Sequence, residues 1–487
     1  MFAIEPLDGT QLRLADQPVL YLQTLFPLSY PEAALKSQVV TEWIEQAENR
    51  LRMQVGSAYG ELPVRPQSDL KEALARFLAQ LLLMDPSLET LNMAVEFWVE
   101  AQAEFLLRLA QDREEIEKIF LGGRSCGPVA AIASGLSDRH HHGRSVAAVT
   151  FESGVKLIYK PRDVRIEEWY FRFLHWLAAG ALLPFKPLTV IEKDGYGWIE
   201  FAEHRVCRSK SELSNYYRNA GALLCTLYVL RARDCHFQNV VASGAYPVLV
   251  DAERLFHPRA STDPDYSSVA DTGLIPDWRR GPEGRLYDVS GLGCIAPRTT
   301  PFRIPVWTAQ GVQFAPGVLT PRVNVPFGPQ AEDTPRLYAG EIAHGFSWTY
   351  GFLMEHREEL LVQISDAAKE PIRYVIRDTA EYYVALNRFP RGAMLSKLTG
   401  PRAVFEPLRG AEMLSLRELD IPRFVLAASD RSLCEVEGCF PLSGYEAVCA
   451  GIDRLNPEDL SRQLKLIQMS WNLFHAAELL SGEHHSQ

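Results

Sequence analysis

The chain has 487 residues, which is enough for two or three domains or for one large enzyme body with helical additions. Its 50 basic and 61 acidic residues give a formal net charge of −11, and Lys and Arg form no stripe interleaved with aromatics, so nucleic acid is excluded as an expected partner. No apolar run reaches the roughly 20 residues of a membrane helix, the N-terminus lacks a secretory-signal pattern, and the eight cysteines form no C-x-x-C pair. We therefore predict a cytoplasmic protein with reduced thiols and no transmembrane segment.

The first 122 residues are predicted to be helical. Ala94, Trp98, Ala101, Phe105 and Leu109 recur at three- and four-residue spacing, which is the period of one face of an α-helix. This spacing predicts one long helix within a helical N-terminal region.

Two β-hairpins are predicted next, with one helix after each of them. The runs VAAVTF and KLIYK lie on either side of the turn residues 152–154, and PLTVIEK and YGWIEF lie on either side of 193–195. Residues 164–180 and 211–232 have helical periodicity, and Ser211 is the expected N-cap of the second helix. The hairpins are expected to form a small antiparallel sheet.

The remaining chain alternates irregular and helical patterns. Residues 258–335 are rich in Gly, Pro and Asp and predict long irregular connections, whereas 340–365 and 457–480 predict helices. The predicted fold class is α+β. We divide the chain into a helical region at 1–122, a sheet-bearing lobe at 123–207, a second lobe at 208–400 and a helical region at 401–487.

The stretch RARDCHFQNVVASGAYPVLVDAERLF, residues 231–256, reads as a hairpin and contains the residue types of phosphoryl transfer. That reaction needs carboxylates on Mg²⁺, a lysine on the phosphates and an acidic group at the incoming hydroxyl, because positioning and charge neutralisation stabilise its transition state. Asp234, His236 and Asn239 predict a catalytic loop. In it, Asp234 would orient or deprotonate the hydroxyl and Asn239 would bind the metal.

Two carboxylates and one lysine complete the predicted set. Asp251 follows the apolar strand PVLV and is expected to hold Mg²⁺ between phosphates, and Glu253 is expected to share that metal. Lys160 ends the second strand of the first hairpin, which is where a kinase places its phosphate-binding lysine. A sheet lysine followed by an Asp-rich loop is the order found in kinases.

A loop before this hairpin is a weaker candidate. The segment SDRHHHGRSV contains Asp138, His140, Gly143 and Arg144 and is suited to close over phosphates. Taken one at a time, all these features have ordinary explanations: a DxHxxN triplet is often a solvated loop, and a strand-end lysine often extends to solvent. Their combination in kinase order makes coincidence much less probable than for any one of them.

In combination, these residues resemble the N-terminal dehydratase domain of class II lanthipeptide synthetases, the LanM enzymes. The resemblance runs from about Asp138 to the C-terminal helices. It is carried by DRHHHGRSV, KLIYKPR, YGWIEF, GALLCTLYVLRARDCHFQN, PVLVDAERLF, YDVSGLG, RYVIRDTAEYY and DIPRF.

The resemblance implies a lipid-kinase-like, two-lobed catalytic core with helical N-terminal and C-terminal additions. It also implies a reaction: Ser and Thr of a ribosomally made precursor peptide are phosphorylated with ATP and Mg²⁺, and phosphate is then eliminated to give dehydroalanine and dehydrobutyrine. The implied kinase residues are Lys160, Asp234, His236, Asn239, Asp251 and Glu253, with Asp138 and His140 in the phosphate-side loop.

The elimination step is implied to use an arginine and a threonine six residues apart, which match Arg373 and Thr379 in RYVIRDT. A cation near the departing phosphate lowers the barrier of such a step. Outside this resemblance, an Arg and a Thr at that distance would indicate only an exposed helix or strand face.

The chain departs from full synthetases, which continue into a zinc-dependent cyclase domain. Cys235 and His236 lie inside the kinase loop, and Cys434 and Cys439 have no nearby His, so we expect no zinc and no cyclisation. The chain is expected to be a stand-alone dehydratase, with any cyclase supplied separately, in preference to an excised domain. Its short N-terminal region leaves recognition of a leader peptide open.

Two other hypotheses stay open. One is a kinase that stops at the phosphorylated peptide or acts on a lipid or small molecule, for which Arg373 would be irrelevant. The other is an inactive scaffold that binds a precursor peptide and partner enzymes. The presence of Lys160, Asp234 and Asp251 argues against a scaffold, because a scaffold does not need a metal-binding carboxylate set.

Overall fold

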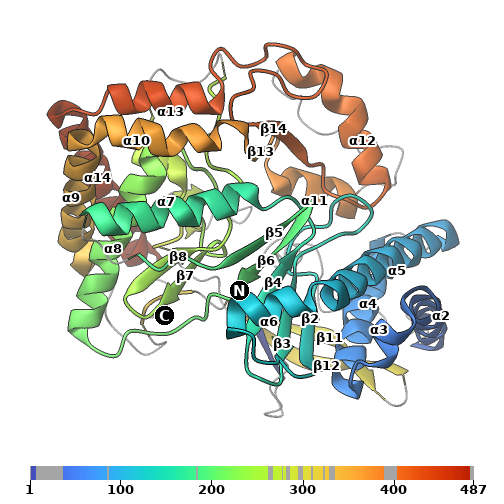
Figure 1. The fold of residues 1–487 in the computed structure, drawn as a ribbon. Coiled ribbons are helices and arrows are strands. Elements are labelled where there is room, and N and C mark those ends of the chain that lie inside the picture. The colour runs from blue at the N-terminus through green and yellow to red at the C-terminus, as the bar shows by residue number, and fades with distance from the viewer. Residues whose placement is uncertain are drawn as a thin grey trace.

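A computed structural model of the chain has a mixed α+β fold (Figure 1). Its five-stranded sheet lies between a group of N-terminal helices and a larger body formed by the later helices (Figure 1). The structure describes residues 2–6, 37–84, 87–181, 185–260, 267–276, 278–280, 286–293, 300–308, 311–321, 324–327, 335–388 and 403–482.

The N-terminal region is helical from residue 37 onward, as predicted. The helical face predicted at 94–109 lies on α5 and is buried, and Ser87 caps that helix by accepting a hydrogen bond from the Thr90 N–H. The prediction is wrong for Phe2–Pro6, which form strand β1. The helices are α2 (Ser37–Val55), α3 (Ser57–Gly60), α4 (Val64–Met84), α5 (Leu88–Gln111) and α6 (Arg113–Leu121).

Both predicted hairpins are present in one antiparallel sheet of order β2-β3-β4-β6-β5. The outer strand β2 was not expected, because its sequence VAAIAS is rich in alanine, which favours helices. The strands are β2 (Val129–Ser134), β3 (Ala147–Phe151), β4 (Lys156–Lys160), β5 (Val190–Lys193) and β6 (Tyr196–Glu200).

The two predicted helices, α7 (Arg165–Ala181) and α8 (Lys210–Val229), follow the hairpins. The N-cap of α8 is Ser209 rather than Ser211, since the Ser209 side chain accepts the Glu212 N–H. Glu212 in turn accepts the Arg208 N–H, so Ser209 and Glu212 together cap the helix start.

The region at 258–335 was predicted to be irregular, and this is wrong for four strands. They form two antiparallel pairs, β9 (Trp278–Arg280) with β10 (Leu286–Asp288) and β11 (Thr300–Thr308) with β12 (Gly311–Pro321). The 3₁₀ helix η2 (Val269–Thr272) precedes them. β1 pairs with β12 and thereby ties the start of the chain to this region.

The C-terminal half is mainly helical, as predicted at 340–365 and 457–480. It also contains the short antiparallel pair β13 and β14, whose segments are 50 residues apart in sequence. The elements are η3 (Pro335–Tyr338), α9 (Ala339–Glu355), α10 (Arg357–Ser365), η4 (Asp366–Lys369), β13 (Pro371–Tyr374), α11 (Thr379–Arg388), η5 (Ala403–Leu408), α12 (Arg409–Arg417), β14 (Phe424–Ala427), α13 (Gly444–Asp453) and α14 (Pro457–Gly482).

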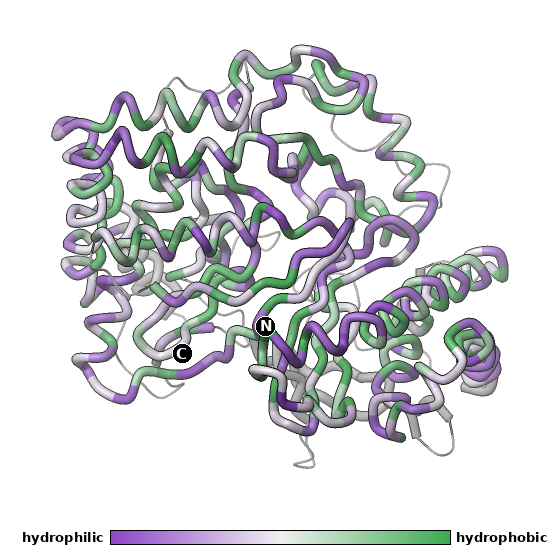
Figure 2. The backbone as a smooth tube through the Cα atoms, in the orientation of Figure 1, coloured by the Kyte–Doolittle hydropathy of each residue, from purple (hydrophilic) through white to green (hydrophobic). Residues whose placement is uncertain are grey.

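The buried hydrophobic residues form two large cores. One joins α2, α4 and α5 to the five-stranded sheet, and the other joins α7, α8, α9 and the C-terminal helices. Figure 2 shows the same pattern as hydrophobic stretches on the sheet strands and alternating colours along the helices. Within the part of the chain that the structure describes, no helix is both long and apolar enough to span a bilayer.

Asp112 joins the N-terminal helices to the sheet. Its buried carboxylate accepts hydrogen bonds from the Tyr196 hydroxyl at 2.9 Å and the Trp198 indole at 2.8 Å. We expect Asp112→Ala to lower the free energy of unfolding by about 3 kcal/mol, because two buried donors lose their acceptor. Urea unfolding measures this change. The exposed variant Asp194→Ala is the control and should change stability by less than about 0.5 kcal/mol.

Candidate active site

A hairpin places Asn239 and Asp251, two of the three predicted metal ligands, at one edge. Strands β7 (Val240–Ser243) and β8 (Tyr246–Leu249) pair in antiparallel register, and the Val250 N–H donates to the Asn239 carbonyl at 2.9 Å. Asn239 and Asp251 therefore lie at the open end of this hairpin. The prediction of a hairpin in this segment is confirmed.

The loop before β7 is fixed by backbone hydrogen bonds on both sides. The Cys235 N–H donates to the Thr272 carbonyl at 2.9 Å, and the Phe237 N–H donates to the Val289 carbonyl at 3.0 Å. Asp234 has a φ of 68°, a left-handed conformation that Asp tolerates better than most residues. The Asn239 side-chain amide donates to the Asp234 carbonyl at 2.9 Å, which leaves the Asn239 Oδ1 as the acceptor available to a cation.

The Asp234 carboxylate is ionised and reaches solvent, with 39% of its side chain exposed. Burial alone would raise its pKa, but the cations beside it, with Arg254 first at 3.3 Å, hold the pKa below its usual value. His236 Nε2 lies 3.7 Å from Asp234 Oδ1, and His236 Nδ1 accepts the Gln238 N–H, so Nε2 carries the ring proton. Asp234 is therefore an accessible proton acceptor beside an imidazole N–H.

Lys160 reaches this edge from the end of β4. Its buried ammonium donates to the Val250 carbonyl at 2.9 Å and pairs with Glu167 of α7 at 3.1 Å, and it lies 3.5 Å from Asp251. Burial would raise the pKa of Glu167, but Arg162 and Lys160 hold it below its usual value. A sheet lysine paired with a helix glutamate is the arrangement that positions the phosphate-binding lysine in kinases.

Arg162 is central to the site, although the sequence pattern does not single it out. It contacts Asp251 at 2.7 Å and Glu253 at 3.0 Å, and it also pairs with Glu167. Burial would lower its pKa, but these three carboxylates raise it well above its usual value. Its place two residues after Lys160, in KLIYKPR, is the only sequence signal for it.

The Glu253 carboxylate forms ion pairs with three arginine guanidinium groups. Arg373 Nη1 lies 2.8 Å from Oε1, and Arg162 Nε and Arg423 Nη2 each lie 3.0 Å from Oε2. Burial would raise the Glu253 pKa, but these cations hold it well below its usual value. Because both oxygens already accept arginines, Asp251 and Asn239 are better placed than Glu253 to offer oxygens to a metal.

The phosphate-side loop is held from the far end of the chain. His140 Nδ1 donates to the Ile421 carbonyl at 2.6 Å, and the Ile421 N–H donates to the Arg139 carbonyl at 2.8 Å. Burial lowers the pKa of His140 well below its usual value, and Arg373 adds to this effect. His140 is therefore neutral, with a lone pair on Nε2.

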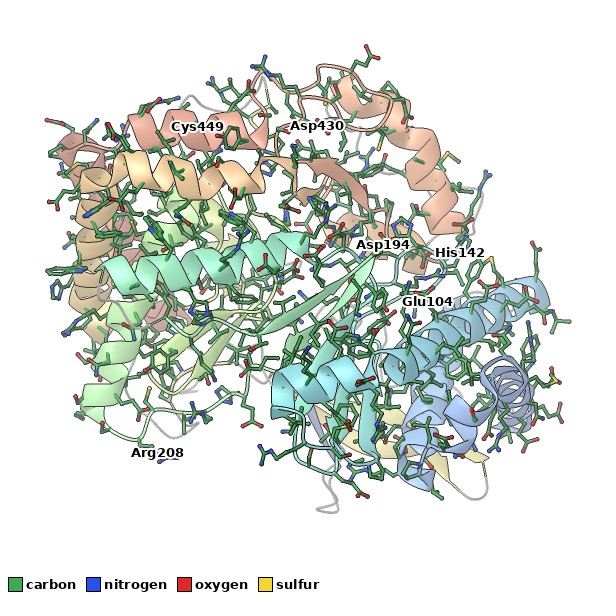
Figure 3. All side chains as sticks on the ribbon, viewed as in Figure 1. Glu104, His142, Asp194, Arg208, Asp430 and Cys449 are labelled. Carbon is green, nitrogen blue, oxygen red and sulfur yellow. The ribbon has the colours of Figure 1, made fainter. Side chains whose placement is uncertain are left out.

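Two further contacts fix this loop. Arg144 binds Glu104 of α5, with Nη2 2.7 Å from Oε2, and the His142 ring stacks on Phe97 at 4.5 Å. Figure 3 shows Glu104 and His142 near one another at the side of the molecule where α5 faces the C-terminal segments. Arg144 is thus tied to a helix, whereas Asp138 and His140 are the loop residues that interact electrostatically with Arg373.

Asp420 is a loop-holding residue that the sequence does not reveal. Its buried carboxylate accepts the N–H groups of His142 and Gly143, the latter at 3.0 Å, and Gly143 has a φ of 78°. Burial raises the pKa of Asp420 to about 6, despite these hydrogen bonds. The segment DIPRF, which was matched only as a motif, therefore anchors the loop.

A raised carboxyl pKa makes a pH-dependent contribution to stability. The folded pKa of about 6 exceeds the ordinary value of 3.8, so the contribution of Asp420 is fully present below about pH 4 and is lost as the pH rises through 6. The side chain introduced by Asp420→Asn does not titrate. We therefore expect the Tm of this variant, relative to that of the unaltered protein, to be higher at pH 7 than at pH 4.5. Thermal unfolding at both pH values measures this gain, and a constant difference in Tm would contradict it.

The structure brings most of the predicted residues together. Arg373 lies on β13. Its backbone N–H donates to the Glu253 carbonyl at 2.7 Å, and its side chain pairs with the Glu253 carboxylate. Burial would lower the Arg373 pKa, but Glu253 and Asp138 raise it. Thr379 begins α11 and is half-buried. Among the described residues, no hydrogen bond joins Thr379 to Arg373 or Glu253.

Comparison with known proteins places this site within a family. Residues 86–427 match the family described as "Domain of unknown function (DUF4135)". The chain belongs to this family. It is also 26% identical over 387 residues to the "Lacticin 481/lactococcin biosynthesis protein LcnDR2" of Lactococcus lactis subsp. lactis, with 68% of this chain and 40% of that protein aligned.

The chain thus spans about two fifths of the length of the curated relative it matches. The match confirms the relation to LanM-type lanthipeptide synthetases that the motifs predicted. The family match contains every predicted site residue, from Asp138 to Thr379.

Proposed function

We propose that this protein dehydrates Ser and Thr of a ribosomally made precursor peptide, by phosphorylating the hydroxyl with ATP and then eliminating phosphate. One observation carries the proposal. Arg373, which lies 120 residues from Glu253 in sequence, binds that glutamate by side chain and backbone, beside the Lys160 and Asp251 set. This contact supports a single site in which, in the proposed function, phosphate is both added and removed.

The kinase half rests on charge and geometry. Lys160, fixed by Glu167, is placed to bind phosphate, and Asp234 is placed to accept the proton of a peptide hydroxyl. We propose that these elements form a lipid-kinase-like core, with the five-stranded sheet in one lobe and α8 with the β7–β8 hairpin in the other. The lysine–glutamate pair between β4 and α7 supports this assignment.

The site also fits phosphate and Mg²⁺. The Nε atoms of Arg254, Arg373 and Arg423 are buried without a hydrogen-bond partner, as expected where a phosphate group supplies the acceptors. Asp251 and the Oδ1 of Asn239 offer oxygens at the hairpin edge, although the described residues contain no group of three or more His, Cys, Asp or Glu suited to a metal. Mg²⁺ there would neutralise phosphate charge, since it commonly uses one or two carboxylates with phosphates and water.

The elimination half uses Arg373 and a neutral base. Removal of the Cα proton must accompany loss of phosphate from Cβ, and Arg373 is placed to stabilise the departing charge. His140 is neutral, and no described residue donates a hydrogen bond to its Nε2. It lies close enough to Arg373 for that cation to lower its pKa, and we propose it as the proton acceptor. The role of Thr379 stays a prediction from the resemblance.

The proposed surroundings follow from the same relation. The relative's name concerns lacticin 481/lactococcin biosynthesis, which supports a precursor peptide as the substrate here. A separate cyclase is a proposed partner, and leader dependence is open to test. The composition and scattered cysteines support a cytoplasmic location.

Intact-mass spectrometry of a Ser/Thr-rich precursor peptide, incubated with the protein, ATP and Mg²⁺, tests the proposal. We expect the loss of one water for each modified residue, and no change when ATP is omitted. A product that keeps its phosphate would instead identify a kinase without elimination. An unchanged peptide, together with no thermal stabilisation by MgATP, would favour a scaffold.

A further inference from the structure

A second arginine reaches Glu253 beside Arg373. Phe424, the first residue of β14, pairs with Tyr374, the last residue of β13. Arg423 directly precedes Phe424 in the chain, and Arg373 directly precedes Tyr374. The two-stranded pair therefore delivers both guanidiniums to one carboxylate, at 2.8 Å and 3.0 Å. The sequence resemblance assigns no role to Arg423.

Both arginines have an unused donor. The Nε atoms of Arg373 and Arg423 are buried and have no hydrogen-bond partner, while their side chains are each only 11% exposed. A buried N–H without an acceptor destabilises the folded protein. Two such donors at one point indicate that an oxygen-rich group binds there.

The charges indicate that this group is an anion. Arg162 has Glu167 and Asp251 in addition to Glu253, whereas among the described residues Arg373 and Arg423 have only Glu253 within ion-pair distance. Burial lowers the pKa of Arg423, and Glu253 offsets this only in part. An added negative charge would stabilise both guanidiniums.

We propose that Arg423 binds the phosphoryl group of the phosphorylated peptide together with Arg373 during elimination; this inference rests on the proposed function. In that step a base takes the Cα proton, the Cα–H electron pair forms the new C=C bond, and the Cβ–O bond breaks. Phosphate leaves with the electron pair of that bond and gains negative charge. Two planar guanidiniums stabilise such an oxyanion better than one, because each offers paired N–H donors.

A synthetic phosphoserine peptide separates this role from phosphorylation. With the full-length protein, we expect Arg423→Gln to slow elimination from this peptide about 10²-fold, mainly in kcat, the order seen when one oxyanion donor is removed. Phosphorylation of the unmodified peptide should change by only a few-fold, so phosphopeptide accumulates in reactions with ATP. The exposed variant Arg431→Gln, on the same segment, is the control and should retain both rates.

Arg423→Lys provides a second test should the Gln variant fail to fold. It keeps a cation beside Glu253, and we expect a smaller loss of elimination and weaker inhibition by inorganic phosphate. Unchanged elimination and phosphate inhibition in this variant would overturn the role of Arg423, as would a parallel loss of phosphorylation and elimination in Arg423→Gln. If the unaltered protein leaves the phosphoserine peptide intact, the proposed dehydratase function itself fails, and the inference fails with it.

Discussion

Asp251→Asn is expected to abolish phosphorylation and dehydration together, with a rate loss of about 10³-fold or more. The substitution removes a negative charge at the hairpin edge, beside Lys160 at 3.5 Å and Arg162 at 2.7 Å. In the proposed reaction, several kcal/mol of phosphate and metal positioning would depend on that charge, and each 1.36 kcal/mol corresponds to about tenfold in rate. Mass spectrometry of the peptide under single-turnover conditions measures both products.

The size of Asn argues against a purely structural effect. It fits the same volume, and Arg162 keeps Glu167 and Glu253 as partners. Circular dichroism and Tm should therefore stay close to those of the unaltered protein. Asp366→Asn, at an exposed ion pair with Arg172, is the matched control and should leave the rate unchanged. Dehydrated peptide from the Asp251 variant at the normal rate would refute the kinase assignment.

Arg373→Gln is expected to leave phosphorylation largely intact while elimination slows about 10²- to 10³-fold. Glu253 keeps Arg162 and Arg423, so its carboxylate does not become unpaired, and the Lys160 set is untouched. The departing phosphate, however, loses a guanidinium. The peptide should accumulate with phosphate attached, which mass spectrometry resolves from the dehydrated product.

Two controls limit the interpretation of this variant. Arg172→Gln removes an exposed arginine on α7 and should change neither step. Feeding the Arg373 variant a phosphoserine peptide tests elimination without phosphorylation. Normal conversion of that peptide would show that Arg373 is not part of the elimination step.

The locally encoded parts of the fold were predictable from sequence. The dipeptide Asp194-Gly195 is a typical hairpin turn, and it connects β5 to β6. Apolar periodicity predicted the helices α5, α7 and α8. The N-cap of α8 could also have been found, because Ser209 and Glu212 have capping-box spacing. Local signals of this kind involve residues fewer than about 20 positions apart.

Other strands were not predictable because their composition points elsewhere. β11 and β12 include Pro301, Pro305 and Pro316, which normally argue against strands since proline donates no ladder hydrogen bond. β2 is alanine-rich, and its place in the sheet depends on β3. Pairing with a distant strand overrides local preference in such segments.

The residues of the candidate site also divide into those that local sequence predicts and those that it does not. Asp234, Asn239 and Asp251 lie close in sequence, and one hairpin brings them together. Asp420 and Arg423 act on residues far earlier in the chain, so the motif DIPRF that contains them indicates no role for either. Family resemblance supplied Arg373, but only the structure places it on Glu253.

The anchoring of the phosphate-side loop by Asp420 has a consequence for the protein during its synthesis. The His142 N–H and the Asp420 carboxylate that accepts it are 278 residues apart. At about 5–20 residues per second, the ribosome needs about 14–56 s to supply the second after the first. Asp234 and Asp251 are synthesised within that interval, before the segment that fixes the loop. The loop can therefore reach its anchored position only after translation has passed Asp420.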